Sequence, residues 1–198
     1  MRVLVLFAHP LGDSLHAALH REIVDRLKAR GHEVDDCDLY AEGFDPVLDA
    51  DSRRRYFDTS SNRTGVERYV ERLFAAEALV LCFPVWCFGP PAILKGFMDR
   101  VMIPGVSFKL DEAGVLRSNL THLRRLVAVT TYGRNRLEMW WMGDPPRILV
   151  KRYLRWFIAP GAPVRYLPLY GIHQNAGNSA SSAYGGFVAR VGREMERF

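Results

Sequence analysis

Several kinds of protein are excluded by what this 198-residue sequence lacks. The three cysteines (Cys37, Cys82 and Cys87) form no C-x-x-C pair and are too few for a disulfide framework, so we expect a reducing compartment. No stretch reaches the roughly 18 consecutive apolar residues that a membrane helix needs. The apolar run in MRVLVLFAHP is also too short for a signal peptide. We therefore expect a cytoplasmic protein with no membrane insertion.

The sequence also lacks the motifs of the common nucleotide-binding loops. It contains neither G-x-G-x-x-G nor a Walker lysine motif. Its formal net charge of +5 comes mainly from arginines, in DSRRRY, GRNR and VKRYLR. None of these clusters follows a nucleic-acid-binding motif, so we expect no nucleic-acid partner. A solvated basic surface explains the charge, and binding of a phosphorylated small molecule is the alternative.

What the sequence does contain is a regular alternation of two patterns. It is 48% hydrophobic and 25% charged, which is enough apolar material for a sizeable core. Short apolar runs predict strands, and apolar residues repeated every three or four positions predict helices. The expected strands are residues 2–8, 32–40, 78–83, 125–133 and 163–172, and the expected helices are residues 15–27, 65–77, 91–101, 144–158 and 178–198. This alternation predicts an α/β fold: one domain, residues 1–198, with a doubly wound five-stranded parallel sheet covered by helices on both faces.

Two stretches fall outside that alternation. Residues 43–62 have no steady period and are interpreted as a long, partly ordered connection. Residues 107–120 contain the turn sequence DEAG and are interpreted as a small hairpin. Neither changes the expected order of the sheet.

Three loops follow strands and should meet at one edge of the sheet, where ligands bind in such folds. They are HPLGDSLH, PVWCFGP and TYGRNR. In the first, Ser14 stands at a helix start, where backbone N–H groups and the helix dipole favour an anion. Ser14 and His16 could hold a phosphate there, although an ordinary helix cap is the simpler interpretation of Ser14.

The second loop has unusually many apolar side chains for a loop that only reverses the chain. Trp86 and Phe88 offer flat apolar faces, which suit a binding pocket. The alternative is that they pack in the core or in a subunit interface. In the third loop, Thr131 offers a hydroxyl and Gly133 would let the backbone approach a ligand closely.

Two histidines and two cysteines receive plainer interpretations. His16 and His20 stand four apart on a helix, a spacing that suits a metal, but no third ligand is evident and we expect none. Cys82 lies in an apolar strand and should be inert core, whereas Cys87 lies in a loop and should be accessible.

The central segment carries a resemblance to a known family. FPVWCFGPPAILKGFMDRVMIPGVSF (residues 83–108) closely resembles the matching segment of NAD(P)H:quinone oxidoreductases of the flavodoxin-like superfamily. VLVLFAHP and AVTTYG fit the same family in the same order, so the resemblance covers most of residues 2–171. The family is similar to azoreductases and to ancillary flavoproteins of potassium-efflux systems. The resemblance implies a flavodoxin-like fold, a noncovalent flavin, hydride transfer from NADH or NADPH, and a homodimer with flavin sites at its interface.

The resemblance also implies which residues form the site. It implies that the flavin phosphate region is held by His9, Ser14, Leu15 and His16, that the ring is lined by Pro84, Val85, Trp86, Cys87 and Phe88, and that its polar edge is contacted by Thr130, Thr131, Tyr132 and Gly133.

The sequence departs from the family after the fourth strand. The mammalian members carry a tyrosine and a histidine there that assist hydride transfer to quinone, and an ungapped match puts Glu138 and Asp144 at those positions. That pair is therefore not carried over, which leaves quinone as the acceptor in doubt. The chain also has no counterpart of the C-terminal region of larger members, so FMN is expected and FAD is the alternative.

We therefore expect a flavin-dependent NAD(P)H oxidoreductase that reduces a quinone or a similar flat aromatic such as a nitro- or azo-compound. Arg134 and Arg136 would read the 2′-phosphate of NADPH, and Trp140 and Trp141, with Phe88, would form an apolar slot for substrate. Alternatively, both arginines lie in solvent and both tryptophans pack at the dimer interface. Two other functions stay open: a regulatory flavoprotein subunit of a membrane transporter, and a flavodoxin-type electron carrier.

Overall fold

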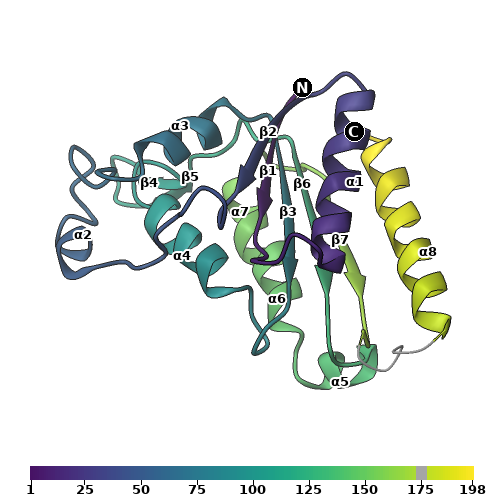
Figure 1. Cartoon of the computed structure of the whole chain (residues 1–198). Coiled ribbons are helices and arrows are strands. Elements are labelled where there is room, and N and C mark those ends of the chain that lie inside the picture. The colour runs from purple at the N-terminus through teal and green to yellow at the C-terminus, as the bar shows by residue number, and fades with distance from the viewer. Residues whose placement is uncertain (173–177) are drawn as a thin grey trace.

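The computed structural model describes residues 1–172 and 178–198. Its centre is a sheet of five strands in the order β2-β1-β3-β6-β7, and every neighbouring pair is parallel (Figure 1). The strands are β1 (Arg2–Phe7), β2 (Glu33–Asp38), β3 (Ala78–Pro84), β6 (Arg125–Thr131) and β7 (Val164–Leu169). The order reverses between β1 and β3, which confirms the flavodoxin-like winding that the sequence predicts.

The central strands are buried on both faces, as their continuous apolar runs predict. All seven residues of β3 are buried, and β1 and β6 are buried beyond their first residue. β2 lies at an edge of the sheet and exposes Glu33 and Asp36. Its more polar sequence is therefore explained by its position.

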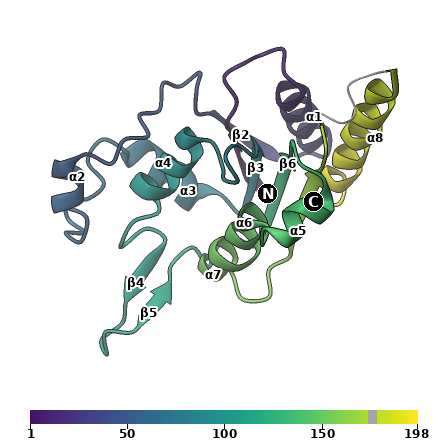
Figure 2. The ribbon, with the colours of Figure 1, turned by 90° about the horizontal axis from the view of Figure 1, so that it is seen from below.

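Helices cover both faces of the sheet, as Figure 2 shows. On one face, α1 (Leu15–Ala29) and α8 (Asn178–Met195) share a core with the strands, in which Leu19 and Ile23 meet Phe187 and Val191. The other face is covered by α3 (Glu67–Ala75), α4 (Ala92–Val101) and the segment formed by α6 (Pro145–Ile148), the π-helical η1 (Leu149–Leu154) and α7 (Arg155–Phe157). None of the described helices has the length and apolar character needed to cross a membrane.

The boundaries of α1 and α4 are set by particular residues. Ser14 caps α1, and Gly31 beyond its end has φ 77°, the left-handed conformation that glycine adopts without strain. Helix α4 begins at Ala92, and Pro91 is its N-cap. The sequence prediction, which put Pro91 in the first helical position, is thus one residue early.

Residues 144–158 form the predicted helix with two differences. Its middle is a π-helix, whose i→i+5 bonding has no sequence signature. Asp144 precedes the helix but makes no capping hydrogen bond, because it has a left-handed backbone (φ 42°) and its carboxylate points elsewhere.

Two small elements project from the body on the side of α3 and α4. The predicted hairpin is present as antiparallel β4 (Phe108–Leu110) and β5 (Leu116–Ser118). The connection over residues 43–62 contains one short helix, α2 (Ala50–Arg54), none of whose residues is buried. In Figure 2 both elements extend away from the sheet.

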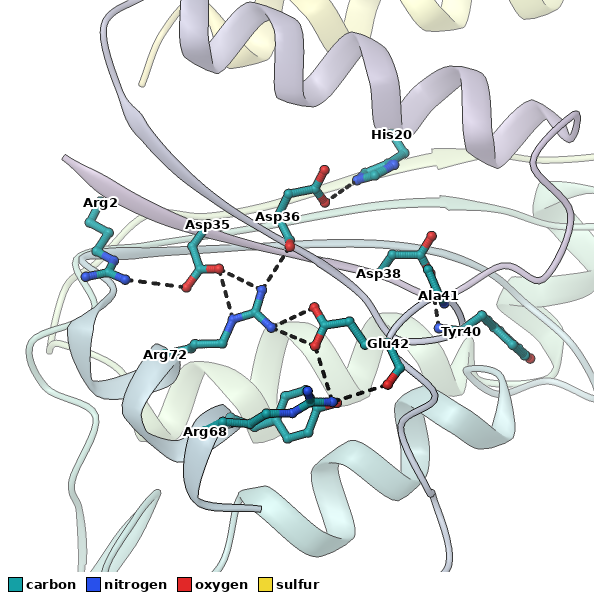
Figure 3. Close-up of polar contacts among 11 residues, drawn as sticks. Arg2, His20, Asp35, Asp36, Asp38, Tyr40, Ala41, Glu42, Arg68 and Arg72 are labelled. Carbon is teal, nitrogen blue, oxygen red and sulfur yellow. Dashed lines mark hydrogen bonds and ion pairs between the residues drawn. The ribbon is translucent and has the colours of Figure 1, made fainter. Parts of the chain in front are cut away.

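A charged network ties the edge strand β2 to α3 (Figure 3). The guanidinium of Arg72 donates to Asp35 Oδ1 from Nε (2.9 Å) and Nη2 (2.6 Å), and from Nη1 to Glu42 Oε1 (2.7 Å). It also donates to the Asp36 carbonyl (2.9 Å). Arg72 thus bridges two carboxylates, and Arg2 near Asp35 and Arg68 near Glu42 supply further positive charge, which lets the acidic strand β2 pack against a helix.

Candidate active site

The three loops identified from the sequence do meet at the carboxyl edge of the sheet. The His9 ring lies 5.6 Å from the Trp86 ring, which joins the first loop to the second. The Val85 N–H donates to the Thr131 carbonyl (2.9 Å), and His16 Nε2 lies 2.9 Å from Thr131 Oγ1. Residues far apart in the sequence are therefore brought to one place.

The Ser14 hydroxyl makes two hydrogen bonds within the protein at the start of α1. Its hydroxyl accepts from the Ala17 N–H (3.1 Å) and donates to the Leu11 carbonyl (2.8 Å). The simpler interpretation of Ser14, a helix cap, thus describes its contacts. The first amides of α1 have no carbonyl one turn earlier in the helix, so they remain the donors suited to an anion. Leu15, at the first helical position, is half-buried against the α1–α8 core.

His16 is buried rather than open to the loop. Its ring lies between Thr131 and Cys82, with Nδ1 3.6 Å from Cys82 Sγ. Burial, together with the nearby His9, lowers the pKa of His16 to about 3. The imidazole is therefore neutral at physiological pH, and its ring stacks on that of His9 in the first loop, with 5.9 Å between the ring centres.

Trp86 to Gly89 form a tight turn with an unusual backbone. The Trp86 N–H donates to the Gly89 carbonyl (3.0 Å), and the Gly89 N–H donates back (2.9 Å). The two central residues, Cys87 (φ 48°) and Phe88 (φ 59°), are both left-handed, which is costly for side chains of this kind. The turn leaves the Trp86 side chain 42% exposed and Phe88 half-buried against the core. Cys87 is exposed, as expected, and Cys82 is buried.

A hollow of about 430 Å³ opens beside this turn. It is lined by Val85, Cys87, Phe88, Tyr132, Gly133, Arg134 and Met139. A second, about 520 Å³, adjoins it and is lined by Arg134, Leu137, Glu138, Trp140, Trp141 and Met142. Arg134 lines both, whereas Arg136 lines neither.

The second hollow is lined mainly by residues of α5 (Arg136–Trp141). This short helix begins with a capping box between Asn135 and Glu138. The side chains of Trp140 and Trp141 are 74% and 81% exposed. Such exposure of two large aromatics on one turn of helix indicates a surface that another molecule covers.

Sequence reasoning missed a polar cluster behind the first hollow. Asp144 accepts from the Tyr132 hydroxyl (2.7 Å), from Arg147 Nε (2.8 Å) and from the Tyr170 hydroxyl (3.0 Å). The Tyr132 hydroxyl also touches that of Tyr166. Burial, then Tyr166 and Asp144, raise the pKa of Tyr132 well above its ordinary value, so the phenol stays protonated and donates.

This cluster fixes the loop between β6 and α6 at both ends. Tyr132 begins the loop, Asp144 ends it, and the Tyr132 ring stacks on Tyr170 at 4.6 Å. The Tyr132 side chain therefore points into the protein, and one face of it closes the hollow. The only sequence signal was an acidic residue between Gly143 and Pro145, which also fits an ordinary helix start.

The histidine pair on α1 does not gather further ligands. His20 Nε2 contacts Asp36 Oδ1 at 2.7 Å, and its ring stacks on Phe7 at 4.3 Å. Across residues 1–172 and 178–198, no three histidine, cysteine or acidic residues are grouped as a metal site would require.

Comparison with known proteins gives the chain its relatives. A family model described as flavodoxin-like fold matches residues 1–179. A ribosyldihydronicotinamide dehydrogenase-like protein of Penicillium crustosum is 32% identical over 156 residues, which is 67% of this chain and 58% of that protein. NAD(P)H dehydrogenase [quinone] 1 of Rattus norvegicus is 29% identical over 67% of this chain and 54% of its own length.

A solved structure extends the likeness over nearly the whole chain. The FMN-dependent NADH-azoreductase of Bacillus anthracis, in complex with FMN, has a TM-score of 0.76 and 17% identity, covering 99% of this chain and 98% of its own. That identity supports the fold alone. The chain spans little more than half the length of the two curated relatives.

Proposed function

The chain belongs to the flavodoxin-like fold family that matches its residues 1–179, and on that premise we propose that it is a flavin-dependent NAD(P)H oxidoreductase. The proposed acceptor is a quinone or another flat aromatic, such as a nitro- or azo-compound. The observation that carries the proposal is the strained aromatic turn at Trp86 to Gly89, which walls a hollow at the carboxyl end of β3. The names of the two curated relatives support the same reaction class.

The residues at this edge fit a flavin. The Thr130 hydroxyl oxygen, at the end of β6, is buried and finds no hydrogen-bond partner among the described residues; Thr130 does not line the first hollow, and a polar ligand edge that reached this oxygen would satisfy it. The open amides at the start of α1 suit a phosphate. Val85 and Phe88 supply an apolar wall for a ring system.

Different residues of the site have different roles toward a bound flavin. A bound flavin supplies hydride chemistry that amino-acid side chains lack. The turn residues Trp86, Cys87 and Phe88 orient the ring and exclude water from one face. Gly133 has no side chain, so the backbone can approach the ring edge closely. Protonated Tyr132, held by Asp144, keeps the floor of the hollow in place.

FMN is the proposed form of the flavin, with FAD as the alternative. The azoreductase of the same fold was solved in complex with FMN, which motivates this choice. The three cysteines are free thiols, which supports a cytoplasmic location.

The proposal is tested by two half-reactions under anaerobic conditions. NADPH or NADH should bleach the flavin absorbance of the purified protein, and a soluble quinone or azo-dye should restore it over many turnovers. An electron carrier would instead need a protein partner for turnover. A transporter subunit would bind the transporter's cytosolic domain and show little turnover of free acceptors; either result would replace the proposed function.

NADPH should be preferred to NADH, and Arg134 should carry the preference. Arg134 lines both hollows, and an arginine can form paired hydrogen bonds to the 2′-phosphate. Losing a charge-assisted contact of about 1.5–3 kcal/mol should lower the NADPH-to-NADH ratio of kcat/KM about tenfold or more in Arg134→Ala.

Arg136→Ala is the matched control for that measurement, because Arg136 lines neither hollow. Its ratio should stay within about twofold of the wild-type ratio, within ordinary variant scatter. Equal ratios in wild type and Arg134→Ala would show that Arg134 does not read the phosphate.

We further propose a homodimer in which the partner covers the open face of the site. Support comes from Trp140 and Trp141, and from Leu110 and Leu116 on the projecting β4–β5 hairpin, all exposed. An isolated two-stranded hairpin is marginal in water, so these apolar residues gain from a covering chain. Light scattering should show a dimer, and Leu110→Ser with Leu116→Ser should shift it toward monomer.

Val47→Ser, at another exposed apolar position, is the control and should leave the dimer intact. A wild-type monomer that holds flavin and turns over would end the dimer proposal.

A further inference from the structure

A basic groove lies between the edge strand β7 and the C-terminal half of α8. Its floor is Val164 to Leu167, the first four of the six residues of β7, and the groove leaves out the carboxyl end of the strand, where the candidate active site lies. Figure 1 shows the C-terminal end of α8 at the far end of the sheet from α5. The groove has a volume of about 360 Å³, within the range of small-molecule pockets.

The walls of the groove are cationic. Its charged lining residues are Lys151, Arg165, Arg190, Arg193, Arg197 and Glu194, five cations against one carboxylate. Arg193 and Arg197 also line a neighbouring hollow of about 540 Å³, together with Arg26, Arg30 and Glu196, whose carboxylate pairs with Arg26. Cationic side chains therefore extend from β7 round to the end of α1, with four arginines against one carboxylate in this hollow.

Much of this charge has no internal partner. Elsewhere in the protein, cations such as Arg72 are paired with carboxylates, in that case Asp35 and Glu42. Within the described part of the chain, Lys151, Arg190 and Arg193 have neither an ion pair nor a side-chain hydrogen bond. Like charges gathered in a concave surface raise the local potential and attract anions.

Glu194 is a buried carboxylate in the wall of the groove. It is only 7% exposed, and it lies between Arg165 (Nε to Oε1, 3.5 Å) and Arg197 (Nη1 to Oε2, 3.6 Å). Glu194 Oε1 is buried without a hydrogen-bond partner in the described residues. The buried carboxylate attracts two exposed guanidinium groups to the groove, and each retains N–H donors for another oxygen ligand.

We propose that this groove binds a small molecule carrying two or more phosphate groups. Arginine dominates the lining, and its planar donors match phosphate oxygens in pairs. A single-stranded nucleic acid would need exposed aromatic side chains for stacking, and the one aromatic lining residue, Tyr166, is buried. A membrane surface would need projecting apolar side chains, whereas the apolar residue Leu167 lies buried in the floor. This site is separate from the proposed flavin site and does not depend on it.

The test is calorimetric titration of the full-length protein with inorganic tripolyphosphate at low salt. We expect saturable binding of one tripolyphosphate per chain. Arg190→Gln with Arg193→Gln should weaken binding at least about tenfold, because even one lost charge-assisted contact of about 1.5 kcal/mol is worth about that factor. Both side chains are exposed and unpaired, so this variant should fold normally.

Two control variants locate the site. Arg53→Gln with Arg54→Gln removes the same charge from exposed α2, at the far side of the molecule, and should leave the dissociation constant unchanged. Arg134→Ala should also leave it unchanged, because that residue lines only the candidate active site. If the α2 variant weakened binding equally, binding would depend only on the net charge of the protein and the groove would not be the site. If Arg134→Ala lost binding, tripolyphosphate would bind at the candidate active site instead.

Two further probes decide the ligand class. A short single-stranded oligonucleotide and anionic lipid vesicles, at matched phosphate concentration, should bind more weakly than tripolyphosphate. Tighter binding of either one, abolished by the Arg190 and Arg193 substitutions, would replace the small-molecule ligand with that macromolecular one.

Discussion

Gly96→Ala is expected to be the most damaging single methyl addition that we identify in the protein. Gly96 lies in the middle of α4, where that helix crosses the connection at Pro46. A Cβ added at Gly96 would stand 2.3 Å from the Pro46 carbonyl oxygen and 2.4 Å from its Cα. Both atoms belong to the backbone, so no rotamer change can relieve the clash.

We expect Gly96→Ala to lower the free energy of unfolding by about 3 kcal/mol or more, since overpacking a tight core costs about 1–3 kcal/mol even where side chains can move. Thermal unfolding monitored by circular dichroism measures this. Gly186→Ala is the matched control, because it is also a helical glycine but has nothing within 4 Å of the added Cβ. That variant should gain up to about 1 kcal/mol from helix propensity. Wild-type-like stability of Gly96→Ala would show that α4 does not pack on Pro46.

Asp144→Ala should damage both stability and catalysis. Its carboxylate holds the side chains of Tyr132, Arg147 and Tyr170, and removal leaves these donors without their acceptor. Breaking a buried charge pair costs about 3–5 kcal/mol, and partial exposure of Arg147 reduces this to about 2–4 kcal/mol. Alanine is also less tolerant than aspartate of the left-handed backbone at this position.

The catalytic effect follows from the position of Asp144. The residue anchors the end of the loop that carries Arg134 and α5, so a loosened loop would misplace the walls of both hollows. We expect kcat/KM to fall about tenfold to a hundredfold. Asp144→Asn keeps an acceptor for Tyr132 and tolerates the same backbone, so its losses should be smaller on both counts. If Asp144→Ala retained wild-type stability and kcat/KM, the cluster would have no anchoring role.

The order of strands and helices could be predicted from the sequence because each element carried a local pattern. The apolar runs of β1, β3 and β6 reflect burial on two faces, and the polar β2 reflects its edge position. The one-residue error at Pro91 concerns a helix boundary, which depends on packing rather than on local propensity, and the π-helix after Ile148 has no sequence signature.

The candidate site could be predicted only in part. The meeting of His9, Trp86 and Thr131 followed from the winding of the sheet, which brings the ends of β1, β3 and β6 together. The left-handed turn at Cys87 and Phe88 could not be predicted, since such turns favour asparagine and glycine.

The polar cluster was missed for a different reason. Tyr132, Asp144 and Tyr170 come from three segments, and only the folded chain shows that their side chains share one buried space. The burial of His16 was also hidden, because a histidine beside a loop appears available to a ligand until the neighbouring strand is in place.

The most direct test of the central claim is mass spectrometry of the cofactor released by heat from the purified protein. The account predicts a yellow protein that releases one FMN per chain, as expected from the aromatic turn and the open start of α1. Release of FAD would correct the choice of flavin while keeping the site. A colourless protein that takes up neither FMN nor FAD on reconstitution would contradict the proposed function.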